Sequence, residues 1–206
     1  MLTEQKLRVA EITQVLLHIQ RTKGTLEALV AMDSARRIWP NLTRDHLHNL
    51  ASRYKDCAGI RDYRITINSS EGCMDSPLET ISRFRLAEAK LPEVKKVEFQ
   101  AEIRIFQSER GWHTFYVDQL INGYLISEID GRAKYSGEYG NAAESVLKQE
   151  RDRERLLLSA GFPMIRSYFE SLRVGPDGNC GYVNSIRHAL QKYPSPAVPL
   201  PREIIL

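Results

Sequence analysis

Strict alternation of apolar and polar side chains identifies the clearest element of the chain, a strand near its centre. Residues 97–106, VEFQAEIRIF, place an apolar side chain at every second position and a charged or amide side chain between them. This period of two is typical of a strand with one buried face. Two more strands are predicted at 112–120 and 124–130, because the turn sequences SERG and Asn122-Gly123 separate the three segments.

Helical spacing of apolar residues is found on both sides of these strands. Helices are predicted at 3–20, 24–37, 43–54, 76–91, 141–160 and 184–193, and a fourth strand at 163–168. Residues 59–68 fit a short helix or a strand equally well. The helix at 76–91 has the best start signal, because Ser76 is an N-cap residue, Pro77 takes the first helical position and Glu79 completes a capping box.

The order of these elements predicts an α/β protein with three parts. NSSEG at 68–72 is rich in turn residues and marks a boundary. We expect a basic helical segment at 1–70, followed at 71–175 by a core of one helix, three strands, a helix and a strand. A C-terminal helix and a proline-rich tail complete the chain at 176–206. The tail sequence PSPAVPLP is expected to be loose.

Composition mainly excludes some classes of protein. The 206 residues are 42% hydrophobic and 27% charged, as in ordinary globular proteins. No apolar run approaches the roughly 18 residues of a membrane span, and the first residues lack the apolar stretch of a signal peptide. A cytoplasmic protein without membrane partners is therefore expected. Cys57, Cys73 and Cys180 are too far apart for a zinc site or a disulfide framework and are expected to be buried thiols.

Charge is unevenly distributed along the chain. Residues 1–70 contain 11 of the 29 Lys and Arg and 7 of the 26 Asp and Glu, so this segment carries +4 and the remainder −1. Such a distribution fits a protein that holds phosphates with its basic helices and cations with its acidic centre. Charge alone fits random surface variation equally well.

The predicted hairpin carries three carboxylates among strongly apolar neighbours. Glu128 and Asp130 lie two apart on one strand, so their side chains share a face. Asp118 on the preceding strand joins that face only if the loop has three residues, 121–123, which pairs position 118 with 126. A two-residue Asn-Gly loop would instead pair position 118 with 127 and place Asp118 behind the sheet.

Carboxylates that share a face repel one another unless a cation neutralises them. Hard oxygen ligands at this density suit Mg²⁺ or Mn²⁺, which bind one or two protein carboxylates together with water and substrate phosphate. Lys134 lies close enough in sequence to orient an attacking water or to stabilise charge on a phosphate. The alternative interpretation is an edge hairpin whose charged side chains are simply solvated.

The ordered set of motifs around these residues resembles a nuclease family. Asp118 stands ten residues before EIDGRAKY, which is followed by the helix ESVLKQERDRERLLLSAG and by GFPMIR, ending at Arg166. This succession is similar to the PD-(D/E)XK nuclease superfamily and, more narrowly, to very-short-patch-repair-like endonuclease domains. MDSPLET resembles the start of that domain in actinobacterial proteins grouped with AbiEi-like type IV antitoxins. The resemblance covers about residues 70–173 and, more faintly, 25–70.

The resemblance implies a restriction-endonuclease-like αβββαβ core and suggests roles for individual residues. Asp118 would be the first metal ligand, and Glu128 and Asp130 would be the carboxylates of the second motif. Lys134 stands where this signature usually has histidine. Asp130 occupies the position, two residues after the acid, where the wider superfamily has its lysine. The chain therefore departs from the family pattern at the residue that would assist the attacking water.

Four further residues have both a structural and a functional interpretation. Glu79 is either a capping residue or, by the resemblance, an additional metal ligand. Glu150 and Glu154 either face the site from the long helix or form exposed ion pairs with neighbouring arginines. Arg166, at the end of the fourth strand, either pairs with a site carboxylate or contacts phosphate.

Two functions follow from these observations and from the resemblance. The first is a Mg²⁺- or Mn²⁺-dependent endonuclease that hydrolyses DNA phosphodiester bonds, with Asp118, Glu128 and Asp130 holding the metal and Lys134 assisting the attacking water. The second is a DNA-binding regulator or type IV antitoxin that keeps the nuclease fold without cleavage and binds a cognate toxin. The displaced lysine favours the second function. The lack of a clear helix-turn-helix pattern in 1–70 argues against it.

Overall fold

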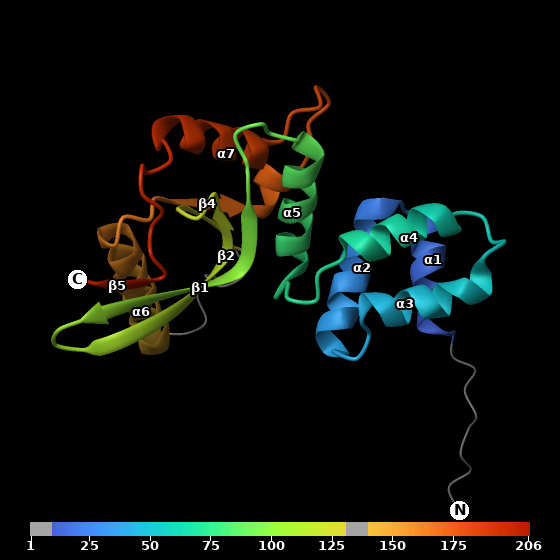
Figure 1. The fold of residues 1–206 in the computed structure, drawn as a ribbon, viewed down its shortest axis with the longest axis horizontal. Helices are drawn as coiled ribbons and strands as arrows, with labels where there is room; N and C mark the ends of the chain where they lie inside the picture. The colour runs from blue at the N-terminus through green and yellow to red at the C-terminus, as the bar shows by residue number, and fades with distance from the viewer. Residues whose placement is uncertain (1–9, 131–139) are drawn as a thin grey trace, which may run out of the picture. The chain divides into compact units, whose positions relative to one another are not determined.

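A computed structural model of the chain, shown in Figure 1, describes residues 10–130 and 140–206, with side chains from Lys148 onward in the second range. The chain divides into two compact units, Met1–Thr80 and Ile81–Leu206, and we describe each by itself. Within the described ranges, no helix is both long enough and apolar enough to cross a membrane.

The first unit contains four described α-helices. They are α1 (Ile12–Thr22), α2 (Thr25–Ile38), α3 (Arg44–Ala51) and α4 (Ile60–Ser69). The predicted helix at 24–37 is confirmed with a shift of one residue. The predicted helix at 43–54 is shorter than expected, because its last turn is a 3-10 helix, Ser52–Tyr54. Residues 1–9, which include the beginning of the helix predicted at 3–20, lie outside the described residues.

The segment at 59–68, whose sequence fitted a helix or a strand equally well, forms helix α4. Its buried side chains, Tyr63, Thr66 and Ile67, are spaced three and four residues apart, which brings them to one face of a helix. Tyr63 and Ile67 pack into a core cluster with residues of the other three helices. The buried members of this cluster are Leu16, Leu17, Met32, Ala35, Leu42, Leu47, Ala51, Tyr63 and Ile67.

The segment that follows α4 is fastened to α2 by a buried carboxylate. Asp33 is 1% exposed, and its two oxygens accept hydrogen bonds from the Glu71 N–H at 2.8 Å and from Thr80 Oγ1 at 2.9 Å. The first unit therefore extends to Thr80, although the sequence placed a boundary near residue 70. Counted over Met1–Thr80, the unit has 11 Lys and Arg against 10 Asp and Glu, so most of its positive excess disappears.

The second unit is built on a five-stranded mixed sheet. Its strands are β1 (Val97–Gln107), β2 (Gly111–Ile121), β3 (Leu125–Asp130), β4 (Met164–Tyr168) and β5 (Glu203–Ile205), in the spatial order β4-β3-β2-β1-β5. β2 pairs antiparallel with β1 and β3, whereas the outer pairs β3–β4 and β1–β5 are parallel. The helices are α5 (Pro77–Ala89), whose first turn lies in the first unit, α6 (Gly140–Ser159) and α7 (Gly181–Lys192).

The mixed α/β class predicted from the sequence is confirmed. The four predicted strands and the succession of one helix, three strands, a helix and a strand are present as α5, β1, β2, β3, α6 and β4. The finer assignment to a restriction-endonuclease-like core stays a prediction.

Strand β5 corrects the expectation of a loose tail. Residues 194–201 have no regular structure, but 203–205 run parallel to β1 with Ile204 opposite Ile105. The backbone N–H of Arg104 donates to the Arg202 carbonyl at 2.8 Å, and Arg104 forms an ion pair with Glu203. An apolar pair and an ion pair thus fix a short strand that is too short to show a period of its own in the sequence.

Helix α6 covers one face of the sheet. Leu120 of β2 and Ile126 of β3 are opposite one another and pack in one core cluster with Leu157 of α6 and with Phe162, which follows the helix. Gly161 ends α6 with a left-handed φ of 90°, which glycine adopts without a steric penalty. This turn directs Phe162 back under the sheet, where its side chain is fully buried.

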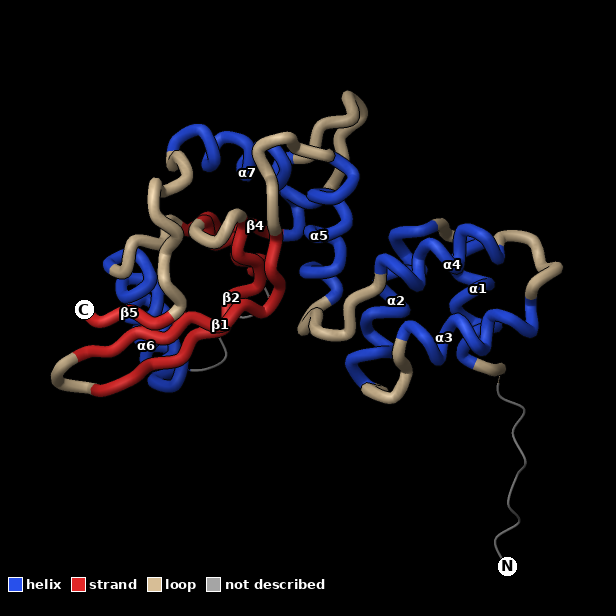
Figure 2. The backbone as a smooth tube through the Cα atoms, viewed as in Figure 1, coloured by secondary structure: helices blue, strands red, loops and turns tan. Residues whose placement is uncertain are grey.

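Helices α5 and α7 meet the opposite face, as the ribbon and tube views indicate (Figures 1 and 2). Gln119, which alternation places on that face, is fully buried. Its amide nitrogen donates to Ser82 Oγ of α5 at 2.6 Å, and its amide oxygen accepts from the Tyr182 hydroxyl of α7 at 2.7 Å. One amide therefore connects the central strand to both helices.

Replacing Tyr182 with phenylalanine is expected to reduce the free energy of unfolding by about 1–3 kcal/mol, because the buried oxygen of Gln119 loses its donor. Burial also raises the pKa of Tyr182 above its usual value of 10. The hydroxyl therefore stays neutral in the folded protein when the unfolded chain already ionises, so wild-type stability should fall as the pH rises above about 10. Urea unfolding at pH 8 and pH 10.5 measures both effects. Equal stability of Tyr182→Phe and wild type at pH 8 would contradict this prediction.

The cysteines differ from the expectation of three buried thiols. Cys180, immediately before α7, is buried, but Cys57 and Cys73 are exposed. Cys57 lies in the connection between the 3-10 helix and α4, and Cys73 in the connection between α4 and α5. Most connecting segments run over the surface, which agrees with the exposure of these two thiols.

Candidate functional site

The hairpin between β2 and β3 decides where the predicted carboxylates lie. Its loop has three residues, 122–124, and the register pairs Gln119 with Ser127 and Ile121 with Leu125. The predicted loop length is confirmed, but the loop begins one residue later than predicted, which shifts the pairs by two positions. Asn122 and Gly123 both have a left-handed backbone, with φ of 53° and 78°.

Asp118 lies on the same face of the sheet as Glu128 and Asp130. Leu120 and Ile126 are paired across the two strands, and each carboxylate is two or four residues from one of them. The ladder between β2 and β3 ends at Gln119 and Ser127. Beyond that pair β3 continues beside β4 as far as Asp130. The two strands therefore separate at the point where the carboxylates begin.

The carboxylate of Asp118 bridges this separation. Its Oδ2 accepts a hydrogen bond from the backbone N–H of Ile129 at 2.8 Å, on the strand that has moved away. The other neighbour of β2 is also disturbed here, since the β1–β2 register has no pair at Gln100, whose φ is 47°. A left-handed glutamine costs of order 1–3 kcal/mol and needs support from its surroundings. Backbone strain and a broken ladder thus coincide beside Asp118.

Arg153 of α6 contacts both of the separated strands. Its Nη2 donates to the Tyr116 carbonyl of β2 at 2.7 Å and to Glu128 Oε1 of β3 at 2.8 Å. Its Nη1 donates to Glu128 Oε2 at 3.2 Å and to Glu150 Oε1 at 3.2 Å. Both side chains are mostly buried, with Arg153 21% and Glu128 12% exposed. The pair is a bidentate arginine–carboxylate contact, the most specific geometry of this kind.

Arg153 was not among the residues predicted from the sequence, although its spacing from Glu150 could have indicated it. The arginine is three residues after Glu150, so both project from the same side of α6. Burial alone would lower the pKa of Arg153, but the hydrogen bonds and negative charge of Glu128, followed by those of Glu150, raise it. Its guanidinium is therefore a permanent positive charge inside the candidate site.

Arg166 of β4 pairs with the acids of α6. It lies beside Glu128 in the parallel register, and its Nη2 donates to Glu150 Oε1 at 2.9 Å and lies 3.9 Å from Glu154 Oε2. Burial lowers its pKa, but the charges of Glu150 and Glu154, and then those of Glu128 and Asp130, outweigh burial and raise it. Of the two interpretations of Arg166, pairing with a carboxylate is the one that its ion pair with Glu150 supports.

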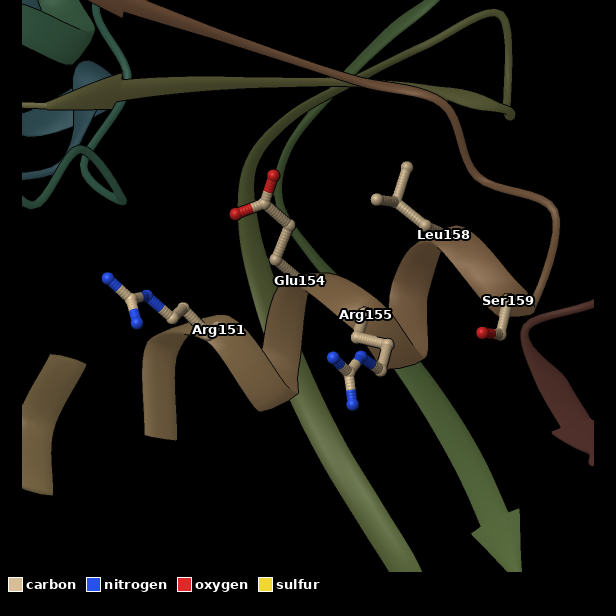
Figure 3. Close-up of a pocket in the computed structure, with 5 residues that line it drawn as sticks. All are labelled: Arg151, Glu154, Arg155, Leu158 and Ser159. Atoms are coloured by element: carbon tan, nitrogen blue, oxygen red, sulfur yellow. The ribbon is translucent and has the colours of Figure 1, made fainter. Parts of the chain in front are cut away.

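Glu150 forms ion pairs with Arg153 of its own helix and with Arg166 of β4, whereas the Glu154 side chain is 43% exposed and lies 3.9 Å from Arg166. Figure 3 shows that the Glu154 side chain leaves α6 on the side away from Arg155. Glu154 nevertheless borders the same open hollow as Arg151, Arg155, Leu158 and Ser159. Glu150 thus faces the site, whereas Glu154 lies at its margin, between Arg166 and this hollow.

The remaining candidates are divided between the described and undescribed parts of the chain. Asp130 is half-buried and makes no hydrogen bond or ion pair with any residue that the structure describes. Lys134 lies outside the described residues. Glu79 is 4% exposed and caps α5, since its Oε2 accepts from the Asp75 N–H at 3.1 Å and its own N–H donates to Ser76 Oγ at 3.3 Å. It belongs to the first unit, and its capping role is the one that these contacts support.

The described part of the site is rich in oxygen ligands but does not gather them around one point. It contains five carboxylates, Asp118, Glu128, Asp130, Glu150 and Glu154, and two arginines, Arg153 and Arg166. Among the described residues, no three His, Cys, Asp or Glu side chains are placed to hold a metal ion together. Carboxylate oxygens are the ligands that Mg²⁺ and Mn²⁺ prefer, so the chemistry of the donors fits such an ion. Both oxygens of Glu128, however, are bonded to Arg153.

No family model, curated protein or solved structure matches the chain. The fold and the site define a mixed α/β protein with a carboxylate–arginine cluster at the junction of three strands and a helix.

Proposed function

We propose that the protein is a Mg²⁺-dependent endonuclease that hydrolyses phosphodiester bonds in DNA. The observation that carries this proposal is the position of Asp118, Glu128 and Asp130, on one face of the sheet where β2 and β3 separate. Where the strands separate, their backbone groups no longer pair with one another, so side chains or a ligand can bind them. Acids are rarely kept in such a setting unless they are paired or bind a cation.

In this proposal Asp118, Glu128 and Asp130 hold a divalent ion, which would polarise the phosphate and lower the pKa of a bound water. Arg166 is only 24% exposed and fixed by Glu150, so it presents a rigid positive charge next to Glu128. Such a group stabilises negative charge that develops on a phosphate oxygen. Lys134 is proposed to assist the attacking water, as the resemblance to the nuclease superfamily implies.

A second candidate function is a DNA-binding regulator or antitoxin without cleavage, which would bind a cognate toxin. The contact between Arg153 and Glu128 favours it, because an arginine that holds both oxygens of a ligand can replace a metal permanently. A protein of this kind would bind DNA without requiring Mg²⁺, and added Mg²⁺ would weaken binding only as any competing cation does.

Nicking of supercoiled plasmid tests the proposal. The wild type should convert plasmid to nicked or linear DNA with Mg²⁺ or Mn²⁺, and excess EDTA should stop the reaction. A sample of Asp118→Asn purified in the same way controls for contaminating nucleases. Intact plasmid at all metal concentrations, together with a gel shift of the same DNA, would refute the endonuclease and favour the regulator.

A further inference from the structure

We propose that Arg153 is the resident cation of the carboxylate site, and that a divalent ion binds Glu128 only by displacing its guanidinium. This inference rests on the proposed metal-dependent function. It assigns to Arg153 a regulatory role that neither the sequence motifs nor the family resemblance indicate.

The first argument is the number of contacts that Arg153 makes within the site. Its two terminal nitrogens make four hydrogen bonds, to Tyr116, to both oxygens of Glu128 and to Glu150. These partners come from β2, β3 and α6, so one side chain connects the three elements that border the site. Arginine makes such planar, bidentate contacts, whereas lysine acts as a point charge.

The second argument is electrostatic. Asp118, Glu128 and Asp130 share a face, and like charges on one face oppose folding unless a cation lies among them. Arg153 supplies that cation from inside the chain at Glu128, whose side chain is 12% exposed, compared with 35% for Glu150 and 43% for Glu154. A Mg²⁺ or Mn²⁺ ion would have to take at least one oxygen of Glu128, which Arg153 holds with both of its terminal nitrogens.

The third argument is that Arg153 has other partners when Glu128 turns away. The Tyr116 carbonyl and Glu150 remain on the side of β2 and α6. The guanidinium can therefore keep two of its four hydrogen bonds while Glu128 binds an ion. Arginine and divalent ion are then competing ligands of one carboxylate, and by linkage the removal of one strengthens the binding of the other.

Binding of Mn²⁺ in solution, followed by the electron paramagnetic resonance signal of the free ion, tests this competition in the full chain. Arg153→Gln should bind Mn²⁺ at least about five-fold more tightly than wild type, the lower end of usual coupling between two ligands. Arg155→Gln is the matched control, because Arg155 lies on the same helix and makes no contact with a described charged partner. Its affinity should equal that of wild type.

The double variant Arg153→Gln/Glu128→Gln locates the effect, since the gain in affinity should disappear when Glu128 cannot ligate. Arg153→Lys provides a second test if Arg153→Gln does not fold. Lysine keeps the positive charge but cannot hold both oxygens of Glu128, so we expect a smaller gain in Mn²⁺ affinity. A lower melting temperature of Arg153→Gln without metal, recovered by Mn²⁺, is the accompanying result in the same samples.

The outcomes separate this inference from the proposed function. If wild type binds Mn²⁺ and Arg153→Gln binds it equally or more weakly, the competition is refuted and the metal site stands. If only Arg153→Gln binds the ion, the competition is supported, and the natural chain is held in a metal-free state. If neither binds, both the competition and the metal-dependent function are refuted.

Discussion

Asp118→Asn and Glu128→Gln are each expected to lower plasmid cleavage at least about a hundred-fold. Both substitutions keep the shape of the side chain and its capacity to accept a hydrogen bond, but they remove the negative charge that would hold the metal. A metal ion contributes several kcal/mol to transition-state stabilisation, and every 1.36 kcal/mol is a factor of ten in rate. Nicked plasmid formed per minute, at equal protein and Mn²⁺ concentrations, is the measurement.

The appropriate control is Glu109→Gln. Glu109 is an exposed acid in the turn between β1 and β2, so the same change of charge is made outside the site. Its cleavage rate should match that of wild type within a factor of two or so, the variation expected for a surface change. Circular dichroism of all three variants must match the wild type. A folded Glu128→Gln protein that retains full cleavage would exclude Glu128 from the catalytic site.

Phe162→Ala is expected to lower the free energy of unfolding of the second unit by about 3–5 kcal/mol. Phe162 is fully buried and packs in the cluster that includes Leu120, Ile126 and Leu157. Its removal leaves a cavity between the end of α6 and the sheet that these neighbours cannot fill. Because α6 also carries Glu150 and Arg153, the loss of Phe162 should weaken the site together with the fold.

Urea unfolding followed by circular dichroism measures this effect, and Leu158→Ala provides the comparison. Leu158 is in the same helix but 49% exposed, so its truncation should cost less than about 1 kcal/mol. Similar midpoints for both variants would mean that the cluster around Phe162 does not determine the stability of the second unit.

Local patterns explain most of the fold that could be predicted. The alternation in β1, the turn residues of the hairpin and the capping residues Ser76 and Glu79 act between neighbours in sequence. Each is found in the structure, with the hairpin loop shifted by one residue. The site depended on one such local property, the odd length of the hairpin loop, which brings Asp118 to the face of Glu128.

Features that depend on contacts between residues far apart in the sequence could not be predicted from local patterns. β5 forms a strand because Ile204 pairs with Ile105 and Glu203 forms an ion pair with Arg104, about a hundred residues earlier in the chain. Three residues are too few for a period to be recognised. Arg153 is one of several arginines in a charged helix, and only the rotation of α6 relative to β3 distinguishes it from Arg151 and Arg155.

The short strand β5 also has a consequence for how the protein behaves at high concentration. Its three residues occupy the backbone groups of β1 at Arg104, Ile105 and Phe106, on what would otherwise be an open strand edge. Open edges of apolar strands recruit strands from other molecules and begin aggregation. Deleting residues 203–206 should therefore cause self-association. Light scattering of the purified protein would detect it well before any loss of secondary structure.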